Sequence, residues 1–493
     1  MTFEKNEILL VNPTGGWESR IDEHYFYPIG LLYLRNYLLK HGIPSSIIDI
    51  NRQGLSTEQF QQMVMSLKPK IIGFTGSPFE RHPLHSFIRG IKKAAPQALV
   101  VVGGPYFTAT AKECLRQLAE VDVVVRGEGE KTFLGLVRTF DDGVDFNGLR
   151  GITFRDSRAE IVETENNSPC NRDDCEIDIN LIPNDESYAP YVYLKNFEQE
   201  KIKAIPVLLA RGCTMKCTFC FNNNNGRFLS RTIPSVITEI KAKRERFQCD
   251  YFWFVDPTFT LREKFAAALC KELKEQCPGI KWYCETRADC SPGLLESMAA
   301  AGCISIDVAL ESGSPKVLKN IQKDLDPQTL VPFTRKCKQL GIRALVFVMY
   351  GLPGETYSEF LETMKILKKI KRDIYTISYS QTLVLPGTRL EMQAKEEKLL
   401  PGNFSWYDPS YSEIPRWVSP MSGREIDKCR RQLYKYQYLL HHSRLSYLGK
   451  LPKLIALSFW HRNEKIKNMI NRVPIVHRFV KAVGKIILGK GSL

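Results

Sequence analysis

The sequence has no apolar run of the roughly 18 residues that a membrane-spanning helix needs. Its longest apolar runs are short, such as Ala344–Tyr350, and favour buried strands. It begins without a long apolar segment, and an acidic residue, Glu4, follows almost at once, so we expect no signal peptide. Both absences favour a cytoplasmic protein. In that reducing compartment the 14 cysteines do not predict a disulfide framework, and metal or redox roles stay open.

Acidic residues are scarce only near the C-terminus. Residues 421–493 hold 16 Lys and Arg against 3 Asp and Glu, which accounts for +13 of the net charge of +15. The rest of the chain is nearly neutral and needs no polyanionic partner. No known nucleic-acid-binding motif accompanies the basic tail, so we expect no nucleic acid as a partner.

The C-terminal region, residues 401–493, is expected to be mainly helical and basic. Within it, Pro474–Leu488 places apolar residues on one face and Lys and Arg toward the other. Such a helix favours peripheral contact with the inner face of an anionic membrane; the alternatives are a helix docked on the protein and a nucleic-acid patch. The aromatic-rich segment Asn403–Val418 is expected either to cap a substrate or to pack beneath the preceding domain.

Residues 5–140 alternate short apolar runs with helical patterns, which is typical of a doubly wound, Rossmann-like α/β domain with a parallel sheet. Ligands of such sheets bind at the carboxyl ends of the strands. Glycines at those ends permit a close backbone approach to a flat ligand. The candidate ligand-binding residues at these ends are Ser77, Gly103, Gly104, Gly127 and Glu128. The alternative is an ordinary doubly wound sheet with a different ligand.

Residues 141–200 are polar and predict a linker, with a possible small hairpin formed by Gly151–Phe154 and Glu160–Glu163. From residue 201 to about 400 the alternation of strands and helices returns. Six βα units predict a partial (βα)6 barrel of the TIM type. Its expected strands are Ile205–Ala210, Tyr251–Val255, Lys281–Thr286, Ile304–Leu310, Arg343–Tyr350 and Tyr375–Leu385.

Three cysteines follow the first expected barrel strand within eight residues: Cys213, Cys217 and Cys220. Three thiolates in such a short segment can converge on one soft metal centre. Three ligands, rather than four, leave one iron of a cubane cluster open to substrate. The alternatives are chance clustering and a zinc site, but structural zinc needs four ligands, and the next cysteine, Cys249, lies beyond a predicted helix.

The spacing CxxxCxxC after the first barrel strand resembles the signature of the radical S-adenosylmethionine (SAM) superfamily, and Phe219 also fits it. Further motifs occur in the order of the cobalamin-binding (B12-binding) class, and the N-terminal VVGGPYFTA and VVRGEGEKTF resemble its cobalamin domain. The subgroup most resembled contains the anaerobic magnesium-protoporphyrin IX monomethyl ester cyclase and related B12-dependent methyltransferases. The ordered barrel motifs are Phe252–Phe259, Trp282–Arg287, Val308–Ser314 and Phe347–Thr356.

The resemblance, which spans about residues 5–400, implies three cofactors: a [4Fe–4S] cluster on the three cysteines, SAM and cobalamin. It implies that cobalamin is bordered by Ser77, Gly103, Gly104, Gly127 and Glu128. It implies that Asp256 contacts the methionine amine of SAM and that Glu311 takes the ribose hydroxyls. Arg287 and Ser312 would line the same region, and Gly351 would lie near the adenine. The structural alternatives are an N-cap role for Asp256, an ion pair of Arg287 with Glu285 or Asp289, and plain turn chemistry around Gly351. His24 is not expected to bind cobalt.

The resemblance also implies an activity: reductive cleavage of SAM to a 5′-deoxyadenosyl radical, and methylation of an unactivated carbon in a small metabolite, lipid or tetrapyrrole. A reductant such as flavodoxin or ferredoxin would be a partner. Two alternatives stay open. One is oxidative cyclisation or ring rearrangement without methyl transfer, and the other is a non-catalytic cobalamin sensor, against which the intact cysteine triad argues.

Overall fold

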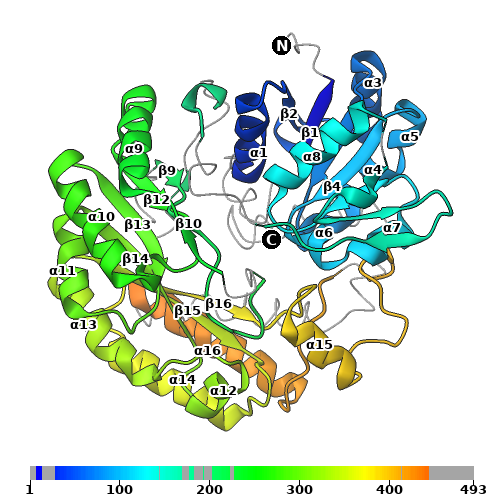
Figure 1. Cartoon of the computed structure of the whole chain (residues 1–493). Coiled ribbons are helices and arrows are strands. Elements are labelled where there is room, and N and C mark those ends of the chain that lie inside the picture. The colour runs from blue at the N-terminus through cyan, green and yellow to red at the C-terminus, as the bar shows by residue number, and fades with distance from the viewer. Residues whose placement is uncertain are drawn as a thin grey trace.

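The computed structural model describes residues 7–13, 28–143, 145–168, 177–182, 192–193, 203–221, 227–411 and 413–442. Two α/β domains lie beside each other, and the C-terminal part of the described chain runs from one toward the other (Figure 1). We call residues 7–168 the N-terminal domain and residues 203–382 the barrel domain. This arrangement confirms the expected fold class.

Five parallel strands form the centre of the N-terminal sheet, in the order β2-β1-β3-β4-β5. Alternate residues of β1 point to opposite layers: Leu9 and Val11 pack with α3 to α7, whereas Ile8 and Leu10 pack with α1 and α8. Helices therefore cover both faces, as a doubly wound sheet requires. The strands are Ile8–Asn12 (β1), Ser46–Asp49 (β2), Ile71–Thr75 (β3), Leu99–Gly103 (β4) and Val123–Val125 (β5); the helices are Ile29–Lys40 (α1), Ile50–Gln53 (α2), Thr57–Leu67 (α3), Arg81–Arg89 (α4), Ile91–Ala94 (α5), Pro105–Ala109 (α6), Ala111–Gln117 (α7) and Gly129–Asp141 (α8).

The hairpin predicted within the polar stretch after residue 140 is present as β6 (Ile152–Arg155) and β7 (Ile161–Glu163). Strand β6 pairs antiparallel with β5, so the hairpin extends the N-terminal sheet. Ile152 and Phe154 are buried in the same core as α1 and α8. The N-terminal sheet therefore reaches to Glu163, well into the segment whose composition predicts a linker.

Six parallel strands form an open, curved sheet in the order β16-β15-β14-β13-β12-β9, and a two-residue strand, β8 (Val192–Tyr193), pairs antiparallel with β9. Helices lie along the outer side of this sheet (Figure 1). The expected (βα)6 partial barrel is confirmed. Its parallel strands are Lys203–Val207 (β9), Tyr251–Phe254 (β12), Lys281–Thr286 (β13), Cys303–Glu311 (β14), Arg343–Tyr350 (β15) and Thr376–Gln381 (β16); its helices are Ile233–Phe247 (α9), Glu263–Gln276 (α10), Pro292–Ala300 (α11), Pro315–Asn320 (α12), Leu330–Gln339 (α13) and Tyr357–Ile370 (α14).

Two further helices follow the barrel, α15 (Arg389–Glu396) and α16 (Gly423–His441). Only α16 falls within the region expected to be helical, residues 401–493, whereas α15 lies in the stretch assigned to the barrel domain. The predicted amphipathic helix Pro474–Leu488 lies outside the described residues. Within the described part of the chain, no helix is both long enough and apolar enough to cross a membrane.

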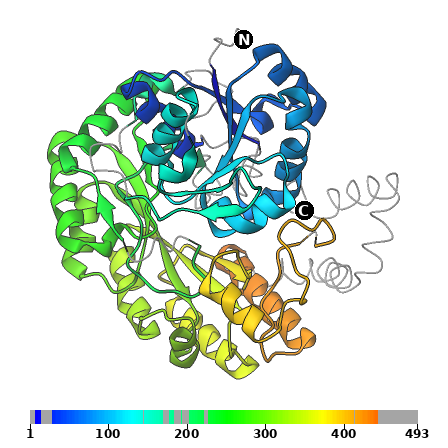
Figure 2. The ribbon, with the colours of Figure 1, turned by 45° about the vertical axis from the view of Figure 1, so that its right-hand side comes forward.

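The aromatic-rich segment between these helices, residues 401–418, is a strap that joins the two domains (Figure 2). Trp406 and Tyr407 are buried in the core of the N-terminal domain, beside α6 and α7. The Tyr407 hydroxyl lies 2.8 Å from Thr110 Oγ1, and the Trp406 amide donates to Glu113 at 2.9 Å. The strap therefore packs on both domains, because Trp417 at its other end packs with Val384 and Leu390 just after the last barrel strand. Its expected contact with substrate stays a prediction.

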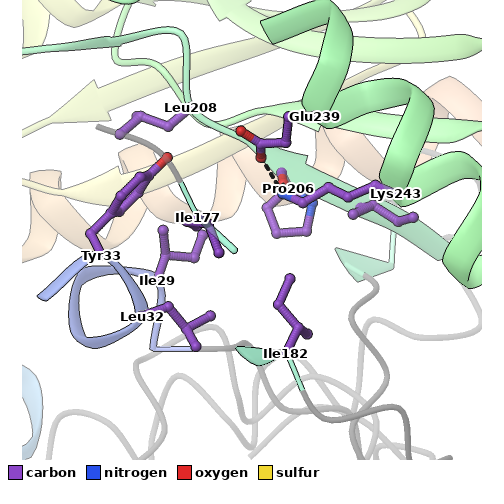
Figure 3. A pocket seen from close by; sticks show the side chains of 10 residues that line it. Ile29, Leu32, Tyr33, Ile177, Ile182, Pro206, Leu208, Glu239 and Lys243 are labelled. Carbon is purple, nitrogen blue, oxygen red and sulfur yellow. Dashed lines mark hydrogen bonds and ion pairs between the residues drawn. The ribbon is translucent and has the colours of Figure 1, made fainter. Parts of the chain in front are cut away.

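A second contact between the domains places α1 against β9 (Figure 3). A small cavity there has a volume of about 10 Å³, room for no more than one water molecule. Its walls are mainly apolar side chains from α1, β9 and the segment 177–182. This cavity is a packing defect rather than a ligand site, and the contact helps to fix how the domains face each other.

Candidate cofactor sites at the domain interface

The cysteine loop, residues 212–221, follows the short strand β10 (Ala210–Arg211) at the carboxyl end of β9. Gly212 turns the chain with a φ of +85°, a conformation that favours glycine. In the middle of the loop, Thr218 is held from two sides. Its amide donates to the Ile321 carbonyl at 2.9 Å, and its carbonyl accepts from the Leu390 amide at 2.9 Å. The loop is therefore held by hydrogen bonds between the end of α12 and the start of α15.

The backbone that leads into the cysteine loop is held by buried charged groups. The Asp256 carboxylate accepts hydrogen bonds from the amides of Leu209 and Ala210, at 3.0 and 2.6 Å. On the other side, Lys243 donates to the Pro206 carbonyl at 2.7 Å, and Glu239 binds Lys243. Burial raises the pKa of Asp256 to about 7, although the two amides favour its ionised form.

Asp256 therefore has a structural role, because both of its carboxylate oxygens accept hydrogen bonds from the backbone that leads to Cys213. The predicted contact of Asp256 with the amine of SAM stays a prediction. An N-cap role, the structural alternative considered for it, is not what these hydrogen bonds show. The sequence correctly predicted that Asp256 lies at the end of β12. It did not predict the direction in which its carboxylate points.

Glu311 and Arg287 lie at the carboxyl ends of β14 and β13, as predicted. Glu311 follows an irregularity in the pairing with β15 and has a φ of +61°, unusual for a residue with a side chain. Arg287 donates to the Asp289 carboxylate at 2.6 Å and to the Asp324 carbonyl, so one of its two predicted alternative pairings is confirmed.

Lys323 is a residue of this site that the sequence did not reveal. Its ammonium lies 3.2 Å from Glu311 Oε1, and both side chains are almost fully buried. Burial raises the pKa of the Cys217 thiol, while the charges of Lys323 and Arg287 oppose this and those of Glu311 and Cys213 add to it. The charges that act on Cys217 thus include those of two residues predicted to bind SAM, Glu311 and Arg287, and that of Lys323.

Ser312 and Gly351 shape the backbone of the barrel mouth. The buried Ser312 hydroxyl lies 3.4 Å from Thr363 Oγ1 on α14 and accepts from the Ser314 amide at 3.2 Å. Gly351 has a φ of +72°, and its amide donates to Glu355 Oε2 at 2.7 Å. Turn chemistry is thus present at both places, and their contacts with SAM stay predictions.

The buried Glu355 carboxylate predicts a pH-dependent stability. Burial raises its pKa from 4.5 to about 7, and its second oxygen has no hydrogen-bond partner. The folded state thus binds the proton of Glu355 more tightly than the unfolded state does. The contribution of the protonated carboxyl group to the free energy of unfolding is therefore lost as pH rises from about 4.5 through 7. A shift of this size corresponds to about 3 kcal/mol. We expect Glu355→Gln to flatten the fall in thermal unfolding temperature between pH 5 and pH 8.

The matched control for this measurement is Glu425→Gln. Glu425 is only partly buried, and hydrogen bonds from Ser422 lower its pKa, so it is ionised over the whole range. This variant should keep the wild-type slope. Equal slopes for wild type and Glu355→Gln would contradict the assignment.

The cysteine loop carries the thiol donors that a metal site needs. Among the described residues, no group of three or more His, Cys, Asp and Glu side chains is already gathered as a metal site. The donor chemistry nevertheless fits an iron–sulfur cluster: Cys213 and Cys217 are free thiols and Cys220 lines an open cavity on the same loop. Beside them, the buried Thr218 hydroxyl lacks a hydrogen-bond partner, and a cluster sulfide is an acceptor of the kind it needs.

A cavity of about 300 Å³ opens at the carboxyl ends of β1, β3, β4 and β5. Four of the five predicted cobalamin-binding residues line it: Gly103, Gly104, Gly127 and Glu128. The fifth, Ser77, is not among the lining residues; its hydroxyl donates to Glu80 at 2.9 Å, where a short 3₁₀ helix begins. The apolar walls and close glycines fit a flat macrocyclic cofactor or its nucleotide tail.

A larger cavity, of about 1110 Å³, lies between the two domains and reaches Cys220. It shares Pro105, Gly127, Glu128 and Arg211 with the smaller cavity. Arg211 lies two residues before Cys213 and pairs with Glu130 at 2.6 Å and Glu128 at 3.4 Å. The loop that carries the cysteines is therefore attached to the edge of the predicted cobalamin groove.

Two known families match the two domains of this chain. Residues 207–367 match the Radical SAM superfamily, and residues 22–137 match the B12 binding domain. The chain is thus an enzyme of the radical SAM type with a B12-binding domain, and its cofactors are a [4Fe–4S] cluster, SAM and cobalamin. The family and the cofactors expected from the sequence are confirmed.

Particular relatives show how far the likeness extends. An uncharacterized methyltransferase of Pyrococcus horikoshii is 27% identical over 439 residues, which are 88% of this chain and 92% of that protein. The anaerobic magnesium-protoporphyrin IX monomethyl ester cyclase of Rubrivivax gelatinosus is 26% identical over 358 residues, 70% of this chain and 63% of the cyclase. The radical SAM methyltransferase TsrM of Kitasatospora setae, solved with cobalamin and a [4Fe–4S] cluster, has a similar fold, with a TM-score of 0.70. The two chains are 18% identical, and the match covers 87% of this chain and 90% of TsrM.

Proposed function

We propose that this enzyme methylates an unactivated carbon of a small organic substrate. The observation that carries the proposal is the shared wall of the two cavities: Gly127, Glu128 and Arg211 line both, and Cys220 lines the larger one. Cofactors held at these two places would face one common space. A substrate in that space would have access to both.

The residues divide into three groups by the cofactor that each would hold. Cys213, Cys217 and Cys220 would hold the cluster, and Gly103, Gly104, Gly127 and Glu128 would border cobalamin. Asp256, Arg287, Glu311, Ser312 and Gly351 would surround SAM. When bound, the cluster and SAM supply a 5′-deoxyadenosyl radical, and cobalamin supplies a transferable methyl group.

The protein's own contribution is placement and shielding. Asp256 and Lys243 fix the strand ahead of the cysteine loop, and Arg211 ties that loop to the N-terminal domain. The strap closes the opposite side of the interface with buried aromatic residues. These contacts would fix the distance between the two cofactor sites and keep bulk water away from a reactive radical.

The large cavity supports a substrate with both apolar and polar parts. Its walls include the aromatic Phe221 and Phe228 and the exposed Arg116 and Arg227. Its volume of about 1110 Å³ exceeds what a single drug-sized ligand fills, so a substrate and part of a cofactor can share it.

Methylation is favoured over cyclisation because a named methyltransferase aligns over 92% of its own length, whereas the cyclase aligns over 63%. A non-catalytic sensor is disfavoured because a sensor needs no cysteine triad, and Cys220 of the triad lines the large cavity beside the predicted cobalamin groove. A reductant of the flavodoxin or ferredoxin class would supply electrons from outside the chain.

The test uses anaerobically reconstituted full-length protein with dithionite, cobalamin and SAM carrying a labelled methyl group, mixed with small molecules extracted from the source cells. We expect 5′-deoxyadenosine and a labelled product. Formation of 5′-deoxyadenosine with a changed but unlabelled product would favour cyclisation or rearrangement. Absence of 5′-deoxyadenosine under all conditions would refute the radical reaction.

We also propose that the basic tail, residues 421–493, contacts an anionic membrane surface when the substrate is lipid-like, because it carries 16 Lys and Arg against 3 Asp and Glu. The full chain should sediment with vesicles containing phosphatidylserine at low salt, and a chain ending at residue 442 should not. Equal sedimentation of the two chains would show that the residues after 442 do not bind the membrane.

A further inference from the structure

Glu391 lies in the first turn of α15, and its side chain is 8% exposed. Both of its carboxyl oxygens accept hydrogen bonds from other segments. Oε1 accepts from the indole N–H of Trp406 at 2.7 Å and has an ion pair with Lys395 at 2.9 Å. Oε2 accepts from the Gly387 amide at 2.7 Å. One buried carboxyl group therefore joins the strap to the turn that precedes α15.

Trp406 carries this connection into the N-terminal domain. It is 1% exposed and packs in the core of that domain. Its amide donates to Glu113 on α7 at 2.9 Å, and its carbonyl oxygen lies 3.4 Å from the Tyr106 hydroxyl on α6. The Trp406 ring thus belongs to one domain, while its indole N–H is bound to Glu391, which follows the other domain in the chain.

Gly387 reaches the N-terminal domain by a second route. Its φ is +73°, and a Cβ atom built on it would lie 2.6 Å from the Ala109 Cβ atom at the end of α6. A side chain here would clash, so glycine is what lets the two domains touch at this point. Gly387 and Ala109 also line the large cavity. By holding the Gly387 amide, Glu391 holds one wall of that cavity.

The same turn of α15 supports the cysteine loop. The amide of Leu390, next to Glu391 in the chain, donates to the Thr218 carbonyl at 2.9 Å in the middle of that loop. The Leu390 side chain is buried, and Phe219 of the loop packs against the same small core. The first turn of α15 is therefore bound to the cysteine loop and, through the strap and the preceding turn, to the N-terminal domain.

We propose that Glu391 is a positioning residue that sets the spacing between the iron–sulfur cluster and cobalamin. The inference rests on the proposed function, in which the two cofactors face one cavity. Glu391 acts through its neighbours and touches neither cofactor. A simple helix-capping role does not account for its carboxyl group, because the cap of α15 is the Thr388 hydroxyl, which accepts from the Glu391 amide at 3.1 Å.

The experiment measures the spacing by electron paramagnetic resonance. The full-length chain is reconstituted anaerobically with cluster and cobalamin and reduced with dithionite, so that both the cluster and cob(II)alamin are paramagnetic. Their magnetic interaction depends on the distance between them. In Glu391→Gln only one oxygen remains as an acceptor, so one of the two N–H donors loses its bond. We expect the interaction to change in strength or to spread over a range of distances.

The same variant should convert radicals to product less well. With labelled SAM and the cell extract, the ratio of labelled product to 5′-deoxyadenosine should fall by up to about 100-fold, since a misplacement of about 1 Å can cost that much. Iron, sulfide and cobalamin contents should equal those of wild type. An unchanged magnetic interaction in Glu391→Gln with full cofactor content would overturn the proposal.

Glu359→Gln is the matched control. Glu359 lies at the corresponding place in α14, three residues after the N-cap Thr356, and has an ion pair with Lys316 at 2.8 Å. Its removal weakens the start of a helix on the outer side of the barrel. This variant should lose some thermal stability but keep the wild-type magnetic interaction. The same spectral change in Glu359→Gln as in Glu391→Gln would also overturn the proposal.

Trp406→Phe gives a second measurement should Glu391→Gln fail to fold. It removes the N–H that binds Glu391 and keeps an aromatic ring in the core. It should change the magnetic interaction in the same direction, and the double variant should change it by less than the sum of the two, because the same link is lost. Additive changes would contradict the link between Trp406 and Glu391.

The outcomes for Glu391 and for methylation are separable. A changed interaction in Glu391→Gln, with no labelled product from wild type, would leave the role of Glu391 intact while refuting methylation. Labelled product from wild type, with an unchanged interaction in both variants, would refute only the role of Glu391. A wild-type chain that binds no cluster would refute both.

Discussion

Replacing Cys217 with alanine is expected to abolish both the bound cluster and the formation of 5′-deoxyadenosine. Cys217 is the central cysteine of the triad, and two remaining thiolates cannot hold a cubane cluster that already lacks a fourth protein ligand. Loss of a residue that only supports a ligand typically costs 10- to 100-fold in metal affinity or activity, so the loss here should exceed about 100-fold. Iron analysis, visible absorption and chromatography of 5′-deoxyadenosine measure it directly.

The control for this variant is Cys249→Ala. Cys249 is also partly buried, and its thiol contacts the Tyr251 carbonyl at 3.7 Å where β12 begins, at the end of that strand away from the cysteine loop. It should keep full iron content and full 5′-deoxyadenosine formation. If Cys249→Ala lost the metal as completely as Cys217→Ala, a four-cysteine zinc site would become the better interpretation.

Local patterns predicted the elements of both domains well. The run Arg343–Tyr350 was expected to be a strand from its apolar, β-branched composition, and β15 has those same bounds. The reason is physical: strands covered on both faces are continuously apolar, and glycine or proline marks where each one ends. Because the carboxyl ends of parallel strands lie at one edge, the same patterns brought Gly103, Gly127 and Glu311 to the correct edges.

Contacts between distant segments were beyond such patterns. Trp406 and Tyr407 belong to the core of a domain that ends more than 200 residues earlier in the sequence, and nothing in their local composition indicates that partner. Lys323 was missed for a similar reason, since a lysine after a short helix is normally exposed. Only the fold shows that Ile321, two residues earlier, is hydrogen-bonded to Thr218 and that the Lys323 side chain turns inward to Glu311.

Side-chain direction was the other limit. The position of Ser77 just after β3 suggested a wall of the ligand groove, but its hydroxyl is turned to Glu80. Asp256 lies at the expected strand end with its carboxylate on backbone amides. A strand end fixes where a residue stands, whereas the hydrogen-bond needs of nearby backbone decide where its polar group points.

Gly103→Leu is expected to weaken cobalamin binding strongly while leaving the fold intact. Gly103 is the last residue of β4 and lines the cavity of about 300 Å³. A Cβ atom at this position would lie 3.4 Å from the Val125 carbonyl, an ordinary contact, and its φ is not left-handed, so the backbone tolerates a side chain. The rest of a leucine would then occupy the space that a cofactor needs.

Overfilling a packed site costs about 1–3 kcal/mol, which corresponds to roughly 5- to 150-fold weaker binding. Gly103→Ala should show a smaller loss, because only a methyl group enters the cavity. Equilibrium dialysis with hydroxocobalamin, quantified by absorption, gives the dissociation constants. Thermal unfolding of each variant without cobalamin verifies that the domain is still folded.

Gly148→Leu separates this steric effect from general damage to the domain. Gly148 is exposed at the end of a 3₁₀ helix (Phe146–Gly148), and nothing lies within 4 Å of a Cβ atom built there. It should bind cobalamin like wild type, because the same side chain is added outside the groove. Wild-type affinity in Gly103→Leu would mean that cobalamin does not enter this cavity, and the corrin would then have to be placed in the larger cavity alone.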